Sequence, residues 1–79
     1  MINVALLGFG RIGQMHAQNI YLNKTLNLLY VYEKIDKLRK KAKNLYNCKI
    51  ENDYKKLFSD KKVDIIFISS PTNTHIRFI

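Results

Sequence analysis

Apolar stretches typical of strands alternate with helix-like stretches along the chain. Residues 2–7 form an almost unbroken apolar run that ends at Gly8, which is typical of a strand buried on both faces. Residues 26–33 and 63–69 place apolar side chains on both sides of an extended chain, and residues 48–51 are a short strand candidate. The pattern therefore predicts four strands.

The segments between these strands carry apolar residues at helical spacing, at residues 11–22, 35–46 and 54–58. In the first helix the spacing rests on Ile12, Met15 and Leu22, and Asn23 is the expected stop. Asn52 or Asp53 is the expected cap of the third helix.

Strands that alternate with helices predict an α/β fold with about four parallel strands and flanking helices. Pro71 is expected to end the last strand, and Thr72 or Thr74 to cap a further helix that begins near His75. No strand is expected after this point, so one edge of the strand at residues 63–69 should be unpaired.

The composition excludes several classes of protein. The chain has 79 residues, enough for one compact domain, and no apolar run approaches the roughly 20 residues that span a bilayer. The N-terminus lacks the pattern of a secretion signal, and the single cysteine, Cys48, excludes an internal disulfide. One cysteine and two distant histidines, His16 and His75, do not make a zinc site. We expect a cytoplasmic protein that has no membrane-spanning segment and no metal site.

The net charge of +8 raises the question of a nucleic-acid partner. Six of the fourteen basic residues fall within residues 34–43, however, where a helical projection collects them on one arc. That arc comprises Lys34, Lys37, Arg39, Lys40, Lys41 and Lys43, and the opposite arc comprises Ile35, Leu38, Ala42, Leu45 and Tyr46. Lysines also outnumber arginines by 11 to 3, whereas base and phosphate recognition favours arginine. The pattern therefore favours a solvated helix face over a nucleic-acid-binding surface.

A glycine-rich motif follows the first strand. Its residues are Gly8, Phe9, Gly10, Arg11, Ile12 and Gly13, which form the pattern G-x-G-x-x-G between a strand and a helix. Gly8 permits the tight turn, Gly10 leaves room for a pyrophosphate, and Gly13 permits close packing of helix and strand. The helix N-terminus would bind the phosphates, and Arg11 either adds a phosphate contact or is simply exposed. The motif predicts a partial Rossmann fold that binds a dinucleotide.

Glu33 lies twenty residues after Gly13, at the end of the second predicted strand. An acidic residue there accepts hydrogen bonds from the adenosine ribose and repels a 2′-phosphate, so NAD is favoured over NADP. Lys34 and Lys37 would soften that repulsion, and the alternative for Glu33 is a solvent-facing strand end.

The last informative segment follows the strand at residues 63–69, where the carboxyl ends of the strands face the ligand crevice. Its residues are Ser69, Ser70, Pro71, Thr72, Asn73, Thr74 and His75. Small hydroxyl side chains there would let a dinucleotide lie close to the backbone. A capped turn is an equally good interpretation.

These motifs resemble the family of glucose–fructose oxidoreductase, inositol dehydrogenase and MocA. The resemblance rests on residues 8–20, on Glu33 where aspartate is usual, on a Tyr-x-x-Leu-like segment at residues 54–57, and on Ser70-Pro71-Thr72-Asn73-Thr74-His75. The resemblance covers essentially the whole chain, and the motif sequences are most similar to those of inositol 2-dehydrogenases. It implies an NAD cofactor, a nicotinamide half lined by residues 69–75, and a first-helix histidine at His16 whose plainer interpretation is a packing residue.

The resemblance also implies hydride transfer between NAD and a polyol or sugar such as myo-inositol, by homo-oligomeric relatives. The family's catalytic Glu-Lys-Pro and Asp-x-x-x-His motifs have no counterpart in these 79 residues. We therefore expect residues 1–79 to be the N-terminal part of a dinucleotide-binding domain, inactive alone, without the rest of that domain or a substrate domain. The alternatives are a stand-alone nucleotide-binding or regulatory module and a basic nucleic-acid-binding protein.

Overall fold

The computed structural model describes residues 1–69 and the backbone of residues 74–78. Eight elements follow one another along the chain: β1 (Ile2–Leu7), α1 (Arg11–Leu22), β2 (Leu26–Tyr32), α2 (Asp36–Tyr46), β3 (Lys49–Glu51), α3 (Tyr54–Ser59), β4 (Ile65–Ser69) and β5 (Thr74–Phe78). The four strands and three helices expected up to residue 69 are confirmed, with ends that differ by one or two residues.

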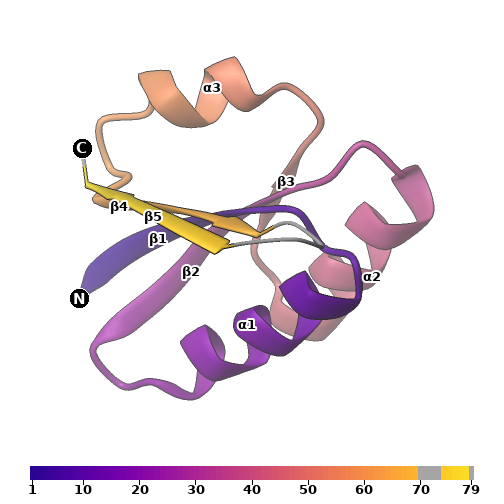
Figure 1. Cartoon of the computed structure of the whole chain (residues 1–79), viewed down its shortest axis with the longest axis horizontal. Helices are drawn as coiled ribbons and strands as arrows, with labels where there is room; N and C mark the ends of the chain where they lie inside the picture. Colours follow the sequence, from indigo (N-terminus) through magenta and orange to yellow (C-terminus); the bar gives the residue numbers. More distant parts are fainter. Residues whose placement is uncertain (70–73, 79) are drawn as a thin grey trace.

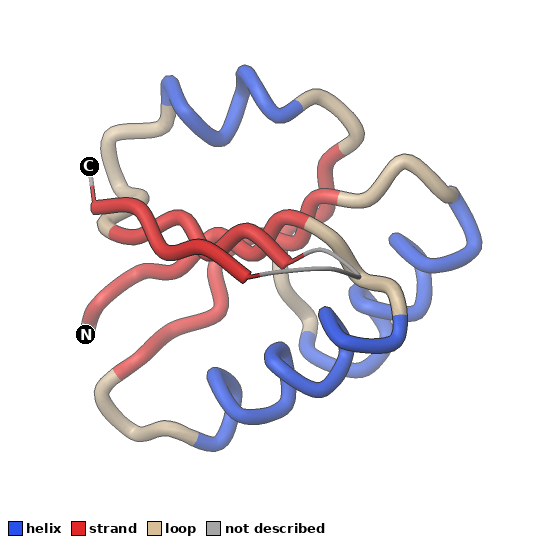
Figure 2. Tube along the Cα trace, in the orientation of Figure 1, coloured by secondary structure: helices blue, strands red, loops and turns tan. Residues whose placement is uncertain are grey.

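The strands form one sheet in the order β3-β2-β1-β4-β5. The first four are parallel, and α1 and α2 lie on one face while α3 lies on the other (Figure 1, Figure 2). The predicted α/β class with four parallel strands and flanking helices is therefore confirmed. Because the strands are parallel, the carboxyl ends of β1, β2 and β4 lie at one edge of the sheet, where the functional residues were expected.

The helix expected to begin near His75 is wrong. Residues 74–78 form β5, which pairs antiparallel with β4 from Ser69 opposite Thr74 to Ile65 opposite Phe78. Isolated helices this short are not self-supporting. The open edge of β4, in contrast, offers unpaired backbone groups, and a run of β-branched and aromatic residues suits a strand. The expectation of an unpaired edge on β4 is therefore wrong as well.

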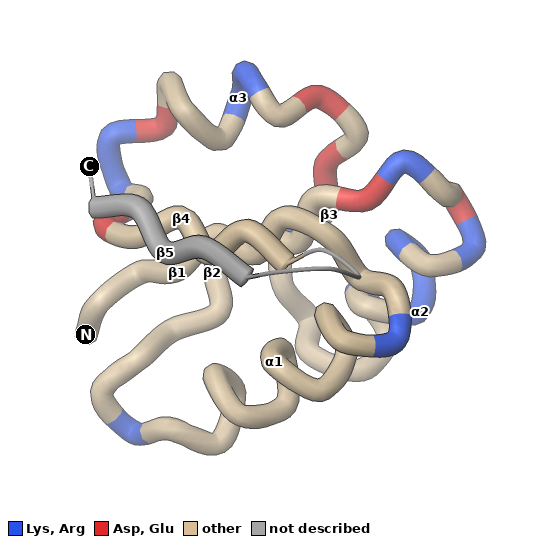
Figure 3. Tube along the Cα trace, in the orientation of Figure 1, with Lys and Arg blue, Asp and Glu red and all other residues tan. Residues whose placement is uncertain are grey.

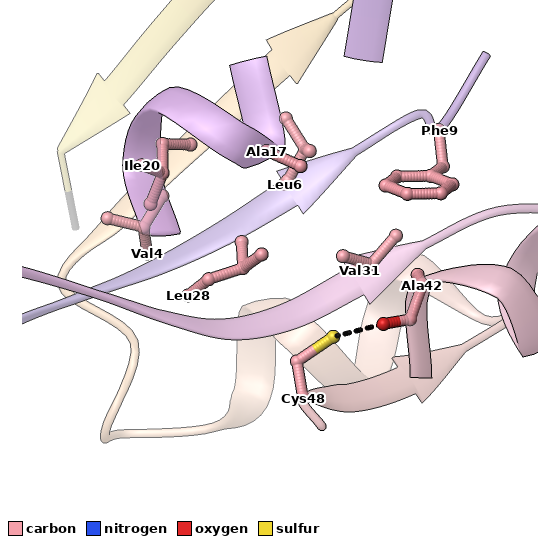
Figure 4. Close-up of a cluster of buried hydrophobic side chains, with 9 residues drawn as sticks. All are labelled: Val4, Leu6, Phe9, Ala17, Ile20, Leu28, Val31, Ala42 and Cys48. Atoms are coloured by element: carbon pink, nitrogen blue, oxygen red, sulfur yellow. Dashed lines mark hydrogen bonds between the residues drawn. The ribbon is translucent and has the colours of Figure 1, made fainter. Parts of the chain in front are cut away.

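Two clusters of buried side chains hold the layers together. The cluster beneath α1 and α2 is shown in Figure 4 and consists of Val4, Leu6, Phe9, Ala17, Ile20, Leu28, Val31, Ala42 and Cys48. The cluster beneath α3 consists of Ala5, Leu57, Val63 and Ile66. Burying an aliphatic or aromatic side chain of this kind contributes about 1.5–3 kcal/mol. Strand β1 contributes side chains to both clusters and is therefore the centre of the core.

Local capping signals set the ends of the helices. Asn23 ends α1, as predicted, and Asn47 ends α2 in the left-handed conformation with φ 51°. Asp53 is the cap of α3, where its carboxylate accepts a 3.0 Å hydrogen bond from the Lys55 amide. Of the two candidate caps, Asp53 is thus the correct one.

The buried face of α1 differs from the one predicted. Gly13, Ala17 and Ile20 are buried, whereas Met15 and Leu22 are 58% and 67% exposed. The reason is that Gly13 is the residue at which the helix approaches the β1 turn, and residues four and seven positions later share its face. A close backbone contact, rather than side-chain size, sets the rotation of this helix.

The prediction for α2 is correct for its lysines and partly wrong for its other residues. The lysines of this helix are exposed, and Figure 3 marks basic positions along its trace. Ile35 and Leu45, expected on the apolar arc, are 56% and 54% exposed. Arg39, expected on the solvated arc, is folded back on the turn before the helix, and its side chain is only 15% exposed.

Candidate functional site

The glycine motif forms the turn between β1 and α1. Gly8 has φ +106°, a conformation that L side chains rarely adopt, and a Cβ there would lie 2.7 Å from the carbonyl oxygen of Ser69. A Cβ on Gly13 would overlap the carbonyl oxygen of Gly8 and lie 3.7 Å from Ser69 Oγ. The two glycines therefore let β1, α1 and the end of β4 meet in one place.

Gly10 differs from its neighbours, because a Cβ built on it would meet no atom of the described residues within 4 Å. It is the N-cap residue of α1, and no side chain caps the helix there. The first helical turn contains no acidic residue, and the exposed Arg11 begins it. The N-terminus of α1 therefore carries its partial positive charge beside a position where glycine adds no side chain.

Glu33 follows directly after β2 and reaches this turn. Its Oε1 accepts a 2.8 Å hydrogen bond from the Phe9 amide, and its Oε2 accepts a 3.1 Å hydrogen bond from the Ile35 amide. The side chain thus joins the glycine motif to the start of α2. An ionised carboxylate accepts about four hydrogen bonds, so capacity for further donors remains.

Phe9 and Ile12 contribute to the site in a way that the motif does not reveal. The Phe9 side chain is fully buried, and its ring meets that of Tyr46 edge-on, with 6.3 Å between centroids. Ile12 is half-buried in α1. Phe9 therefore anchors the turn to the core under α1 and α2, and only its backbone takes part in the predicted site.

The residues predicted after β4 are only partly described. Ser69 lies at the carboxyl end of β4 beside Gly8 and Gly13, as expected. Ser70, Pro71, Thr72 and Asn73 lie outside the described residues. His75 lies in β5, where its backbone pairs with that of Ile68 in β4, so His75 does not begin a helix.

The sequence did not indicate two polar contacts, one with the turn between β1 and α1 and one with the turn between β2 and α2. Gln14 Nε2 donates a 3.2 Å hydrogen bond to the Phe9 carbonyl oxygen. Arg39 Nη1 donates to the carbonyl oxygens of Glu33 and Lys34, at 2.7 and 2.9 Å. No residue pattern points to either contact, because each depends on how the turn and the helix meet in space.

Three further groups, on His16, Asp36 and Cys48, have structural surroundings. The His16 ring lies 4.7 Å from that of Phe67 in β4, which supports its interpretation as a packing residue. Lys40 and then Arg39, both within 3.0 Å of Asp36, hold the pKa of that carboxyl below its usual value. Burial raises the pKa of the Cys48 thiol.

The described residues contain no group of three or more His, Cys, Asp or Glu side chains that could hold a metal ion. In this part of the chain, no helix has both the length and the apolar character that crossing a membrane requires.

An uncapped helix N-terminus, an open position at Gly10 and a carboxylate at the end of the next strand together suit a phosphate joined to a ribose. The fold and the site define a dinucleotide-binding Rossmann domain. The sequence matches the oxidoreductase family with an NAD-binding Rossmann fold over residues 2–79, and the chain belongs to this family. It is accordingly an NAD-binding Rossmann domain, as the resemblance implied.

Several relatives are inositol dehydrogenases. The chain is 31% identical to myo-inositol 2-dehydrogenase of Thermotoga maritima over 80 residues, which cover 99% of this chain and 24% of that protein. Among solved structures, scyllo-inositol dehydrogenase of Lactobacillus casei with bound NAD(H) and scyllo-inositol is 25% identical, with a TM-score of 0.82 over 90% of this chain and 22% of the other. Myo-inositol dehydrogenase of Corynebacterium glutamicum is 29% identical, with a TM-score of 0.81 over 91% and 22% of the two chains. The chain spans about a quarter of the length of the curated relative from Thermotoga maritima.

Proposed function

We propose that residues 8–13 and Glu33 bind the adenosine and pyrophosphate half of NAD. The observation that carries the proposal is the position of Gly10, where a Cβ would meet none of the described residues within 4 Å, at an α1 N-terminus that no described side chain caps. Backbone N–H groups at a helix N-terminus and the helix dipole both favour a phosphate. Arg11, exposed in the first turn, adds positive charge at the same place.

Glu33 supplies the ribose part of the site. Its carboxylate is held by the Phe9 and Ile35 amides, and it retains capacity to accept from ribose hydroxyls. A 2′-phosphate would bring negative charge against this carboxylate, which supports a preference for NAD over NADP. The exposed Lys34 and Lys37 reduce that preference without reversing it.

The nicotinamide half of the cofactor is assigned to the segment after β4. Ser69 lies beside Gly8 and Gly13, at the strand end next to the proposed pyrophosphate site, which supports this assignment. Ser70, Pro71, Thr72, Asn73 and His75 are assigned by the resemblance of their motif to that of the family. NAD, when bound, supplies the hydride acceptor of the reaction.

For the whole protein we propose hydride transfer between NAD and a polyol or sugar such as myo-inositol. The names of the Thermotoga, Lactobacillus and Corynebacterium relatives support this substrate class. The 79 residues contain no Glu-Lys-Pro or Asp-x-x-x-His motif, so we propose that they form the N-terminal part of the cofactor domain and have no turnover alone. A cytoplasmic location and homo-oligomeric assembly of the full-length relatives belong to the same proposal.

Titration of the 79-residue chain with NAD, NADP and nicotinamide mononucleotide tests the cofactor site. Mapping of amide shifts by NMR should show NAD perturbing residues 8–13 and residue 33, with NADP binding more weakly. Nicotinamide mononucleotide, which lacks the adenosine half, should leave residue 33 unperturbed. Equal or tighter binding of NADP would contradict the role of Glu33, and a folded chain that binds no dinucleotide would contradict the site.

A further inference from the structure

Arg39 holds together the turn that presents Glu33. One guanidinium nitrogen, Nη1, donates to the carbonyl oxygens of Glu33 and Lys34, at 2.7 and 2.9 Å, and Nη2 donates to Asp36 Oδ1 at 3.0 Å. A single side chain thus contacts three residues between the end of β2 and the start of α2: Glu33, Lys34 and Asp36. Its planar, rigid arrangement of donors makes arginine suited to such multiple contacts, whereas lysine has one compact ammonium.

The position of the Glu33 carboxylate depends on this turn. The carboxylate bridges the amide of Phe9 in the glycine motif and the amide of Ile35 at the start of α2. The contact with the Ile35 amide requires that Glu33 keep its place relative to the start of α2. Arg39 contributes to this constraint, because it lies at the end of the first turn of α2 and its side chain donates to the Glu33 carbonyl oxygen.

The surroundings of Arg39 indicate a fixed side chain. Its side chain is 15% exposed, in contrast to 72% for Lys40, its neighbour in the same helix. Lys40 also contacts Asp36, at 3.0 Å, but among the hydrogen bonds of the described residues it has none to the turn carbonyls. The two basic residues thus share one partner and differ in the contact with Glu33.

We infer that Arg39 is a positioning residue for the adenosine ribose site: it acts through Glu33 and determines how strongly the site distinguishes a ribose from a deoxyribose. The inference rests on the proposed function, in which Glu33 accepts from the ribose. It concerns the ribose part of the site alone, because the pyrophosphate part is formed by Gly10 and the N-terminus of α1. Loss of Arg39 should therefore affect ribose recognition and leave phosphate binding in place.

The test compares ADP with 2′-deoxy-ADP, which carry the same pyrophosphate and differ in the 2′-hydroxyl. The 79-residue chain should bind ADP about tenfold more tightly, as expected for a hydrogen bond to a charged acceptor. In Arg39→Met this ratio should fall below about threefold, while the affinity for 2′-deoxy-ADP stays within about twofold of the original, because the pyrophosphate site is intact. Lys40→Met is the matched control, since it removes the same charge from the same helix and the same Asp36 contact, and it should keep the tenfold ratio.

Each outcome supports or overturns the inference. An Arg39→Met variant that keeps the ribose preference, or that loses affinity for both ligands equally, overturns it while the proposed NAD site stands. A folded parent chain that binds neither ligand overturns the proposed site and this inference together, and a parent that binds both equally overturns the ribose role of Glu33. If Arg39→Met does not fold, Arg39→Lys decides: an intermediate ratio supports the inference, and an unchanged ratio overturns it.

Discussion

Replacement of Gly10 by serine should raise the stability of the domain and weaken its binding of NAD. Gly10 has φ −73° and ψ −164°, an extended conformation that any residue adopts, and a Cβ there meets no atom within 4 Å in the part of the chain that the structure describes. Serine is among the preferred N-cap residues, and its hydroxyl can accept from an amide of the first turn of α1. The change is thus free of strain and adds a cap that the helix lacks.

The two effects have opposite signs and different sizes. Relative to glycine, an added serine cap contributes a few tenths of a kcal/mol, and the reduced freedom of the unfolded chain adds about 0.4–1 kcal/mol. The same hydroxyl occupies the space and the N–H group that the pyrophosphate needs. Loss of one hydrogen bond to a charged group costs roughly 1.5–3 kcal/mol, which corresponds to an affinity at least tenfold lower.

Urea denaturation followed by circular dichroism measures the stability, and calorimetric titration with NAD measures the affinity. Gly10→Ala is a matched control that adds the Cβ without the capping oxygen, so it separates the loss of space from the loss of the N–H group. Gly10→Val, with a larger side chain and no cap, should abolish binding at little cost to the fold. A serine variant that binds NAD as tightly as the parent would refute the assignment of this space to the pyrophosphate.

Three further predictions concern stability and reactivity. Gly13→Ala should destabilise the domain by at least 1–3 kcal/mol in urea denaturation, because its Cβ overlaps the Gly8 carbonyl oxygen; a neutral effect would show that α1 can move away from β1. Tyr30 donates a 2.7 Å hydrogen bond to Asp60, which is the largest cause that raises the pKa of Tyr30 from 10.0 to about 12. The folded state therefore favours the protonated phenol: this contribution is complete below pH 10 and is lost as the pH rises toward 12. The urea midpoint should fall over this range by more in the parent than in Tyr30→Phe, in which Tyr46, with its own raised pKa, remains; equal falls would contradict the role of the Asp60 contact. Cys48 is 4% exposed, and burial raises the pKa of its thiol. A thiol reagent should therefore label it only as fast as the domain opens, which hydrogen exchange measures independently; rapid labelling of the native protein would contradict its place in the core.

Much of the site could be predicted because its signals are local. The unbroken apolar run of β1, the spacing of the glycines and the position of Glu33 after β2 each depend on a few neighbouring residues. The structure places these elements together as a parallel sheet requires, with Ser69 at the neighbouring strand end. The glycine motif, Glu33 and Ser69 each lie at the carboxyl end of a different strand. They lie close together because parallel strands end at the same edge of the sheet.

The contacts within the site were not predictable in the same way. The motif did not show that the Phe9 side chain enters the core, or that the Phe9 amide binds Glu33. The helical projection placed Arg39 among solvated lysines, yet its long side chain folds back onto two carbonyl oxygens. Such choices depend on which unpaired backbone groups lie within reach, and a projection of side chains on a helix contains no information about them.

By itself, the sequence determined the order of the elements through Ser69, the parallel class of the sheet and the place of the dinucleotide motif, since hydrophobic periodicity and glycine spacing are properties of short segments. The tertiary structure decided the rest. It determined the rotation of α1, because Gly13 must approach Gly8, and it determined that residues 74–78 become a strand, because the edge of β4 offers backbone partners that a five-residue helix lacks. Both decisions depend on contacts between residues far apart in the chain, whose energies no local pattern records.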